Sequence, residues 1–307
     1  MTNFILYAVT VLVWGSSWIA VAMQLGDVPV QVSIAYRFFL AAFVMYVFCR
    51  LSGRRIRFAA SDHARIALQG LLLFCLNYFL IYLCTQYLTS GLVSVIFSTL
   101  VVWNIVGTAI MFRKPISIQV GLGATLGLGG IAAVFWPELS AFNVSGPTVT
   151  GLALGLAAAI SASGGMLISA RFQKRGLPLI ETTTLAMFYG ALFMSTLNLV
   201  LGDPFAFDTS LRYVSSLFFL ALLGSVVGFG CYLTLVGRIG ADRAGYATLL
   251  FPIIALTLST LFENFHWTGP GLLGVALVLI GNVIILLKPK LPTAVKPLTL
   301  RNDEPTP

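Results

Sequence analysis

The chain has 307 residues, of which 58% are hydrophobic and 9% are charged, and its mean hydropathy is +0.96. Soluble domains carry roughly 25% charged residues, so this composition excludes a protein with a water-covered surface. The formal net charge of +8 does not indicate nucleic-acid binding, because the basic residues lie in connections between apolar stretches and not on a patch interleaved with aromatic residues.

Ten apolar stretches follow one another along the chain, and each is long enough, at about 20 residues, to cross a bilayer as a helix. The connections between them leave no room for a soluble domain. The first stretch is expected to be a retained transmembrane helix, because it is too long for a secretory signal and no basic segment precedes it. The predicted spans are 4–23, 31–51, 66–84, 90–112, 118–136, 149–170, 179–200, 214–237, 245–262 and 270–287.

The basic residues predict the orientation of these spans. Sixteen of the 18 lysines and arginines lie in every second connection or after the last span, and the opposite connections contain only Arg212. Basic connections stay on the cytoplasmic side, so both termini are expected to be cytoplasmic, in a bacterial-type cytoplasmic (inner) membrane. The proline-containing tail 289–307 is expected to be disordered near the anionic inner leaflet. The sixteen are Arg50, Arg54, Arg55, Arg57, Arg65, Arg113, Lys114, Arg171, Lys174, Arg175, Arg238, Arg243, Lys288, Lys290, Lys296 and Arg301.

An internal repeat is visible where the two halves of the chain end. The stretches 90–137 and 241–289 share an order of small residues, an apolar span, a polar break and a glycine-rich span. Because five spans are an odd number, the second copy would enter the membrane from the opposite side. We therefore predict an all-α integral membrane protein with ten transmembrane helices in two inverted five-helix repeats, 1–145 and 146–288, with a binding site between them. The corresponding glycine pairs, each seven residues apart, are Gly123 with Gly130 and Gly274 with Gly281.

No catalytic motif is present, and neither histidine nor cysteine spacing indicates a metal site, so we expect neither an enzyme nor a cofactor. Arg37 lies within the span 31–51, where a charged side chain costs on the order of 2.5–3.5 kcal/mol on insertion scales. Two interpretations stay open. Arg37 either faces a cavity as the partner of a substrate carboxylate, or it reaches the outer interface or a carbonyl of a neighbouring helix.

Aromatic and weakly polar side chains recur within three spans and predict a pocket for zwitterionic or aromatic solutes. Their polar atoms need partners inside the helix bundle or in a cavity. The alternative for each residue is ordinary hydrogen bonding and packing between helices. The substrate-binding candidates, Arg37 included, are Trp14, Ser17, Arg37, Asn77, Tyr78, Tyr82, Trp103 and Ser163.

Two residues near the end of the chain are candidates for gating or for kinking a helix. Pro252 lies inside the span 245–262, where it would bend the helix and free a backbone carbonyl. Glu263 follows that span at the outer end, where it is readily solvated. We interpret Glu263 as structural first and as a gate second.

Several motifs resemble the EamA branch of the drug/metabolite transporter superfamily. They are Trp14-Gly15-Ser16-Ser17-Trp18, Arg37-Phe38, Gly240-Ala241-Asp242-Arg243-Ala244, Phe251-Pro252-Ile253-Ile254-Ala255 and Ser259-Thr260-Leu261-Phe262-Glu263. The resemblance covers residues 4–288. It implies a ten-helix, two-repeat transporter of small organic metabolites, often amino acids and often outward.

The first half departs from the pattern of that family at two places. It has Val102 where the family usually has Pro, and Arg113-Lys114 where the family usually has Glu, whereas Pro252 and Glu263 are kept in the second half. The first six spans contain no acidic residue, which argues against proton/drug antiport on a membrane carboxylate.

The sequence therefore favours a secondary transporter that moves amino acids, aromatic or otherwise neutral, outward by alternating access. An exporter of cationic drugs is the alternative; it would need acidic residues facing the cavity, and the spans offer only Glu181. A membrane-embedded enzyme or a lipid-handling protein would need a catalytic cluster. The expected partners are a small-molecule substrate and the lipid bilayer, without nucleic acid. A monomer is the working expectation, with oligomeric state, exact substrate, coupling ion and direction of flux left open.

Overall fold

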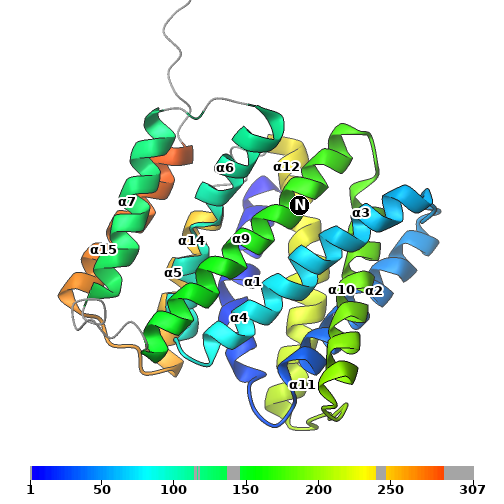
Figure 1. Ribbon diagram of the computed structural model, residues 1–307, viewed down its shortest axis with the longest axis horizontal. Coiled ribbons are helices and arrows are strands. Elements are labelled where there is room, and N and C mark those ends of the chain that lie inside the picture. The colour runs from blue at the N-terminus through cyan, green and yellow to red at the C-terminus, as the bar shows by residue number, and fades with distance from the viewer. Residues whose placement is uncertain (1, 114–115, 117, 137–145, 240–246, 287–307) are drawn as a thin grey trace, which may run out of the picture.

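The computed structural model describes residues 2–113, 116, 118–136, 146–239 and 247–286 (Figure 1). This part of the chain is helical and contains no strand. Each predicted apolar stretch coincides, within a few residues at either end, with one helix or with consecutive helices. The tail 289–307 and the residues next to the boundary between the predicted repeats lie outside the described residues.

The first half consists of α1 (Asn3–Met23), α2 (Val30–Leu51), α3 (Ala60–Gly70), the π-helix η1 (Leu71–Leu76), α4 (Asn77–Thr85), α5 (Ser90–Phe97), α6 (Leu100–Phe112) and α7 (Ile118–Val134). The second half consists of α9 (Pro147–Lys174), α10 (Leu179–Leu201), α11 (Leu211–Phe218), the π-helix η2 (Phe219–Val227), α12 (Gly228–Ile239), α14 (Ala247–Phe262) and α15 (Gly269–Leu286).

Seven helical stretches in the described chain are long and apolar enough to cross a membrane. Three further apolar helices, Ile118–Val134, Leu250–Phe262 and Gly269–Ile285, are shorter. The protein is thus an all-helical, multi-pass membrane protein. That all ten stretches cross the bilayer stays a prediction.

Two continuous helical stretches each contain a π-helical segment, α3–η1–α4 and α11–η2–α12. In a π-helix each backbone N–H bonds to the carbonyl five residues earlier, which inserts an extra residue into the turn. The Asn77 N–H accordingly donates to the Leu72 carbonyl, and the Gly228 N–H donates to the Leu223 carbonyl. Sequence periodicity gave no indication of either segment.

Helices from the two halves pack against each other in pairs, α2 with α10 and α7 with α15. The α7–α15 pair lies at one side of the molecule, and α2, α3 and α10 lie at the other, with α1, α4, α5 and α9 between them (Figure 1).

Glycines bring α7 and α15 into backbone contact. A Cβ atom at Gly123 would lie 2.5 Å from the Gly281 carbonyl oxygen, and one at Gly130 would lie 2.5 Å from that of Gly274. The reverse contacts have the same distance. The two glycine pairs noted in the sequence therefore face each other across an antiparallel helix pair, as close-packing residues do in membranes.

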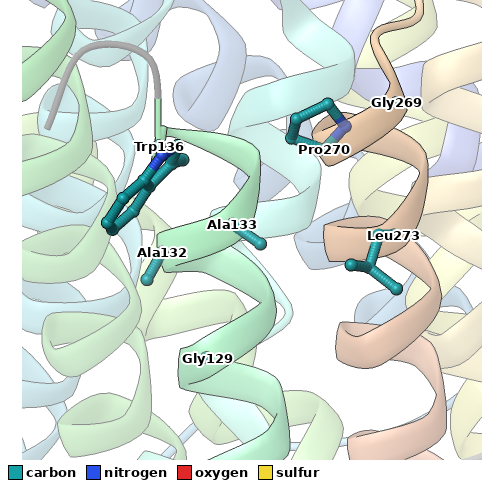
Figure 2. Close-up of a pocket in the computed structure, with 7 residues that line it drawn as sticks. All are labelled: Gly129, Ala132, Ala133, Trp136, Gly269, Pro270 and Leu273. Atoms are coloured by element: carbon teal, nitrogen blue, oxygen red, sulfur yellow. The ribbon is translucent and has the colours of Figure 1, made fainter. Parts of the chain in front are cut away.

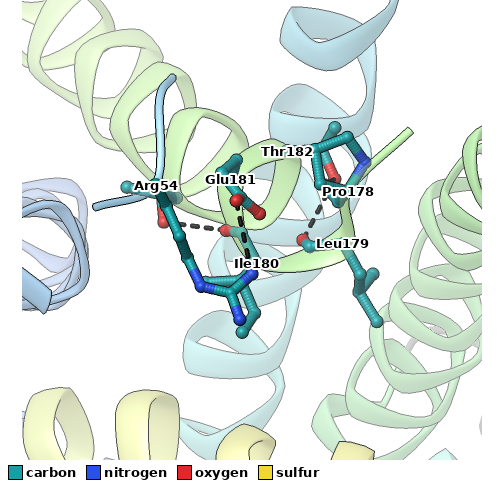
Figure 3. A network of polar contacts seen from close by, with 7 residues as sticks. Arg54, Pro178, Leu179, Ile180, Glu181 and Thr182 are labelled. Atoms are coloured by element: carbon teal, nitrogen blue, oxygen red, sulfur yellow. Dashed lines mark hydrogen bonds and ion pairs between the residues drawn. The ribbon is translucent and has the colours of Figure 1, made fainter. Parts of the chain in front are cut away.

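Ion pairs join the basic connections at one end of the bundle, which we call the basic end. Arg175, after α9, contacts Asp62 in α3 at 2.9 Å, and Arg65 contacts the same carboxylate at 3.1 Å. Arg54, after α2, contacts Glu181 in the first turn of α10 at 3.4 Å (Figure 3). Each connection is thereby tied to a helix of the other half.

Candidate binding cavity

A cavity of about 340 Å³ lies between the two halves, lined by residues from α1, α2, α3, η1, α4, α5, α6, α9, α10, η2, α12 and α14. Aromatic rings form much of its wall, and Arg37 is the one charged residue among the described residues that line it. The aromatic residues of the lining are Trp14, Trp18, Phe74, Tyr78, Phe97, Phe229, Tyr232 and Phe251.

The cavity brings together six of the ten residues singled out in the sequence. The other four do not line it. Whether any of the ten binds a substrate stays a prediction. The lining includes Trp14, Ser17, Arg37, Asn77, Tyr78 and Pro252, and it does not include Tyr82, Trp103, Ser163 or Glu263.

Three of the residues outside the lining are Tyr82, Trp103 and Ser163. Tyr82 is fully buried, and its hydroxyl donates to the Gln24 side-chain oxygen. Trp103 precedes Asn104, which does line the cavity; neighbouring residues on a helix point about 100° apart. Ser163 is buried in α9 next to Ala162, which lines the cavity.

Arg37 is buried, with only 2% of its surface exposed. Its guanidinium carbon lies 4.4 Å from the ring centroid of Tyr78 and 5.1 Å from that of Phe38. The Nε and Nη1 atoms have no hydrogen-bond partner, and the ion pairs found among the described residues involve other arginines. The side chain thus lines the cavity without reaching the surface, and it lies against two ring faces without forming an ion pair in the described chain. Each such cation–π contact is worth about 2 kcal/mol when desolvated.

Trp14 is fixed in place by a hydrogen bond to η2. Its indole Nε1 donates to the Gly224 carbonyl at 2.9 Å, and its ring contacts Phe229, Tyr232 and Phe251 with centroid separations of 5.1 to 5.6 Å. The widened turn of a π-helix leaves carbonyls free to accept such side-chain donors.

Gly224 is a cavity residue that the sequence analysis missed. A Cβ atom there would lie 3.3 Å from the Ser17 hydroxyl and 3.7 Å from Arg37 Nη2. The glycine therefore lets η2 approach α1 and α2 closely. Its only sequence signal is a small residue in an apolar run, which ordinary helix packing also explains.

Besides the exposed Gln173 of α9, three carboxamides line the cavity: Gln69 in α3, Asn77 in α4 and Asn104 in α6. The Asn77 amide nitrogen donates to the Leu73 carbonyl at 3.2 Å, within its own helix. The side-chain oxygens of all three carboxamides are buried and accept no hydrogen bond. Gln69 was not among the predicted site residues, although an amide side chain within an apolar span could have indicated it.

The cavity extends toward the basic end of the bundle. Its most exposed lining residue, Gln173, lies in the last turn of α9, next to Lys174 and Arg175. Toward the opposite end the lining stops at Val21 and Ile81.

The end opposite the basic connections is closed by contacts between the halves. Glu263, directly after α14, accepts hydrogen bonds from the Ser90 backbone N–H at 2.9 Å and from the Ser90 hydroxyl at 2.6 Å. Gln31 in α2 donates to Asn198 at 3.0 Å and to Asp203 at 2.7 Å. This end of the bundle is thereby joined by hydrogen bonds to two carboxylates.

The acidic residues of the described spans are engaged away from the cavity. Glu181 is 5% exposed and pairs with Arg54 (Figure 3), and it does not line the cavity. A site for cationic drugs would need a carboxylate in the lining, and the described lining has none. No group of three His, Cys, Asp or Glu that could hold a metal ion is found in the part of the chain that the structure describes.

A second hollow lies between α7 and α15, with Ala132 and Gly129 on α7, Trp136 just after its end, and Pro270 and Leu273 on α15 (Figure 2). Its volume is about 430 Å³, and its wall is almost entirely apolar. Without converging polar groups it lacks the features that orient a specific ligand.

The model of the EamA-like transporter family matches residues 2–136 and again residues 149–287. The chain belongs to this family. It is 22% identical to PagO of Salmonella typhimurium, with 94% of both chains covered. It is 23% identical to a protein of Escherichia coli K12 named as a probable amino-acid metabolite efflux pump, with 91% of this chain and 93% of that protein covered. It is 22% identical to the uncharacterized transporter YoaV of Bacillus subtilis, with 88% and 91% covered.

A solved crystal structure shows the same fold. It aligns with a TM-score of 0.65 at 17% identity, covering 92% of this chain and 96% of that one. The EamA assignment confirms the resemblance found in the sequence, and it establishes a membrane transporter family for the chain.

Proposed function

We propose that this EamA-family protein is a secondary transporter that moves amino acids with aromatic or other neutral side chains outward across a bacterial-type inner membrane. The observation that carries the proposal is Arg37, a buried cation without a carboxylate partner in a cavity walled by aromatic rings. A substrate carboxylate would neutralise it, and an apolar side chain would pack on the rings. The E. coli relative named as a probable amino-acid metabolite efflux pump supports the same substrate class.

The proposed architecture is ten transmembrane helices in two inverted repeats, 1–145 and 146–288. Three observations support it: the family model matches twice, α7 and α15 form reciprocal glycine contacts, and a π-helix interrupts one helical stretch in each half. Both termini and the basic end would face the cytoplasm.

In this proposed arrangement the cavity would be entered from the cytoplasm, beside Gln173, and the contact between Glu263 and Ser90 would close its outer end. Export would follow when the two halves rock about the central cavity and separate the contact between Glu263 and Ser90. Substrate taken up beside Gln173 would then leave between α5 and α14.

The test is a competition assay in proteoliposomes with a panel of amino acids, run with and without a proton gradient. We expect neutral and aromatic amino acids to be transported and to compete with one another, and organic cations without a carboxylate to be ignored. Failure of every amino acid to cross, with the reconstituted protein shown to be folded by its helical circular dichroism, would overturn the proposal.

A further inference from the structure

Carboxamide oxygens without partners are confined to the cavity. Every buried carboxamide oxygen that lacks a hydrogen bond in the described chain belongs to a cavity residue, namely Gln69, Asn77 or Asn104. Two carboxamide oxygens of buried residues outside the cavity are used: that of Gln24 accepts from Tyr82, and that of Asn198 accepts from Gln31. Because buried polar groups are normally satisfied, an orphaned set gathered in one place points to a ligand donor.

The charge of the cavity determines what that donor must carry. Arg37 is the one charged residue of the described lining, so a substrate carrying only positive charge would meet an unpaired buried cation. An ammonium group becomes acceptable when a carboxylate on the same molecule neutralises Arg37. Neutral carbonyl oxygens can then accept its three N–H donors without adding charge of their own.

Asn77 is the carboxamide that directly precedes a residue in contact with Arg37. The ring of the following residue, Tyr78, lies 4.4 Å from the Arg37 guanidinium, and Asn77 and Tyr78 both line the cavity. The Asn77 amide nitrogen donates to the Leu73 carbonyl, whereas the Asn77 side-chain oxygen has no hydrogen-bond partner. In an α-amino acid the ammonium and the carboxylate are attached to one carbon, so their acceptors must be close together.

We propose that Asn77, together with Gln69 and Asn104, receives the substrate ammonium, and that Arg37 receives the carboxylate of the same molecule. This proposal rests on the proposed function and narrows it to zwitterions. Selectivity follows from the missing partners: an acid without the ammonium leaves the amide oxygens unpaired, and an amine without the carboxylate leaves Arg37 unpaired. Sites built to hydrogen-bond a group reject analogues that lack it.

We call the carboxamides that receive the ammonium the ammonium pole and Arg37 the carboxylate pole. Three matched probes test the two poles: phenylalanine carries both groups, 3-phenylpropionate lacks the ammonium, and 2-phenylethylamine lacks the carboxylate. Their binding to the purified full chain is measured by calorimetry, and phenylalanine transport is measured in proteoliposomes. For the wild type we expect phenylalanine to bind at least tenfold more tightly than either analogue. Equal binding of phenylalanine and 3-phenylpropionate would overturn the ammonium pole.

The variants separate the ammonium pole from a general effect on the cavity. Asn77→Leu should weaken phenylalanine at least tenfold and leave 3-phenylpropionate unchanged. Asn77→Asp, which supplies a carboxylate, should bind 2-phenylethylamine where the wild type does not. Asn104→Leu serves as a second removal if the Asn77 variants fail to fold, with the same expected split between the two probes.

Gln24→Glu is the matched control. Gln24 is buried outside the cavity, its amide nitrogen has no partner, and glutamate keeps the oxygen that Tyr82 requires. This variant should gain no binding of 2-phenylethylamine, and such a gain would overturn the role of Asn77. Phenylalanine transport with undiminished binding in the Asn77 and Asn104 variants would overturn the ammonium pole alone. If phenylalanine did not bind to the wild type, both the ammonium pole and phenylalanine as a substrate in the proposed function would be overturned. If phenylalanine bound but was not transported, only the proposed function would be overturned.

Discussion

At the scale of single residues, the cavity is organised by one buried arginine. Arg37 is surrounded by Phe38 and Tyr78 and lies near Gly224, whose missing side chain makes room for it. The ring faces partly replace the solvation that a guanidinium loses on burial. They provide no hydrogen-bond acceptor for the Nε and Nη1 donors, so each of these donors remains available to a carboxylate oxygen.

Replacing Arg37 should therefore separate two classes of substrate. Arg37→Ala is expected to reduce transport of carboxylate-bearing substrates by at least tenfold, because a bond to a charged group is worth about 1.5–3 kcal/mol. Arg37→Lys should recover part of the loss, since it keeps the charge but not the planar pair of donors. Initial transport rates at several substrate concentrations measure both effects. A uniform loss that tracks reduced folded protein would instead assign Arg37 a structural role.

The sequence indicated some cavity residues and not others. Arg37 and Trp14 were found because a charge or a large indole in an apolar span needs an explanation. Gly224 was not found, because ordinary helix packing explains a glycine in an apolar span as well as a binding site does. Tyr82 follows Tyr78 by four residues, and four residues turn a helix about 40° past a full turn, so the two side chains do not lie on the same line along the helix. Tyr82 consequently faces Gln24 and not the cavity.

At the scale of secondary-structure elements, the two π-helices receive side chains from the other half. Trp14 in α1 donates to the Gly224 carbonyl in η2 at 2.9 Å, and Ser161 in α9 donates to the Leu72 carbonyl in η1 at 2.7 Å. Each half thus holds the irregular helix of the other through one hydrogen bond. The ends of the helices were predictable from hydropathy, whereas the π-helices were not, because tertiary contacts and not local composition stabilise the wider turn.

Removing these two donors should have different consequences. Trp14→Phe and Ser161→Ala each lose one hydrogen bond, and each should lower the free energy of unfolding by about 0.5–1.5 kcal/mol. Trp14 lines the cavity and Ser161 does not, so Trp14→Phe alone should also weaken substrate binding. Thermal unfolding in detergent and calorimetric binding check the two effects. Equal loss of binding in both variants would contradict this division.

At the scale of the whole molecule, the halves meet along paired helices, and the α7–α15 pair depends on glycine. Gly130→Ala places a Cβ 2.5 Å from the Gly274 carbonyl oxygen and must separate the helices, which typically costs about 1–3 kcal/mol. Gly129→Ala is the control, because no atom lies within 4 Å of the Cβ position at Gly129. We expect a lower melting temperature for Gly130→Ala and little change for Gly129→Ala. Similar melting temperatures for the two variants would show that the close approach does not contribute to stability.

The contact between Glu263 and Ser90 joins the halves at the end away from the basic connections. Glu263→Gln keeps an acceptor oxygen but loses the charge that strengthens both bonds, each by roughly twofold. Amide hydrogen exchange at the start of α5 should therefore become faster, while exchange in α7 should not change. Asp208→Asn is a suitable control, because that exposed carboxylate is bonded locally to Ser210. Unchanged amide exchange at Ser90 would show that the Glu263 carboxylate does not hold the start of α5 closed.

The π-helix η1 also sets where the chain can change in length. A π-helical turn holds one residue more than an α-helical turn, so deleting one residue from Leu71–Leu76 would restore a regular α-helix and leave the later residues of that helix on their present faces. The same deletion in the α-helical part before η1 would turn Asn77 and Tyr78 by about 100° and take them out of the cavity, although every side chain of the site would still be encoded. The extra residue of η1 thus marks the part of this helix whose length can change without moving the site.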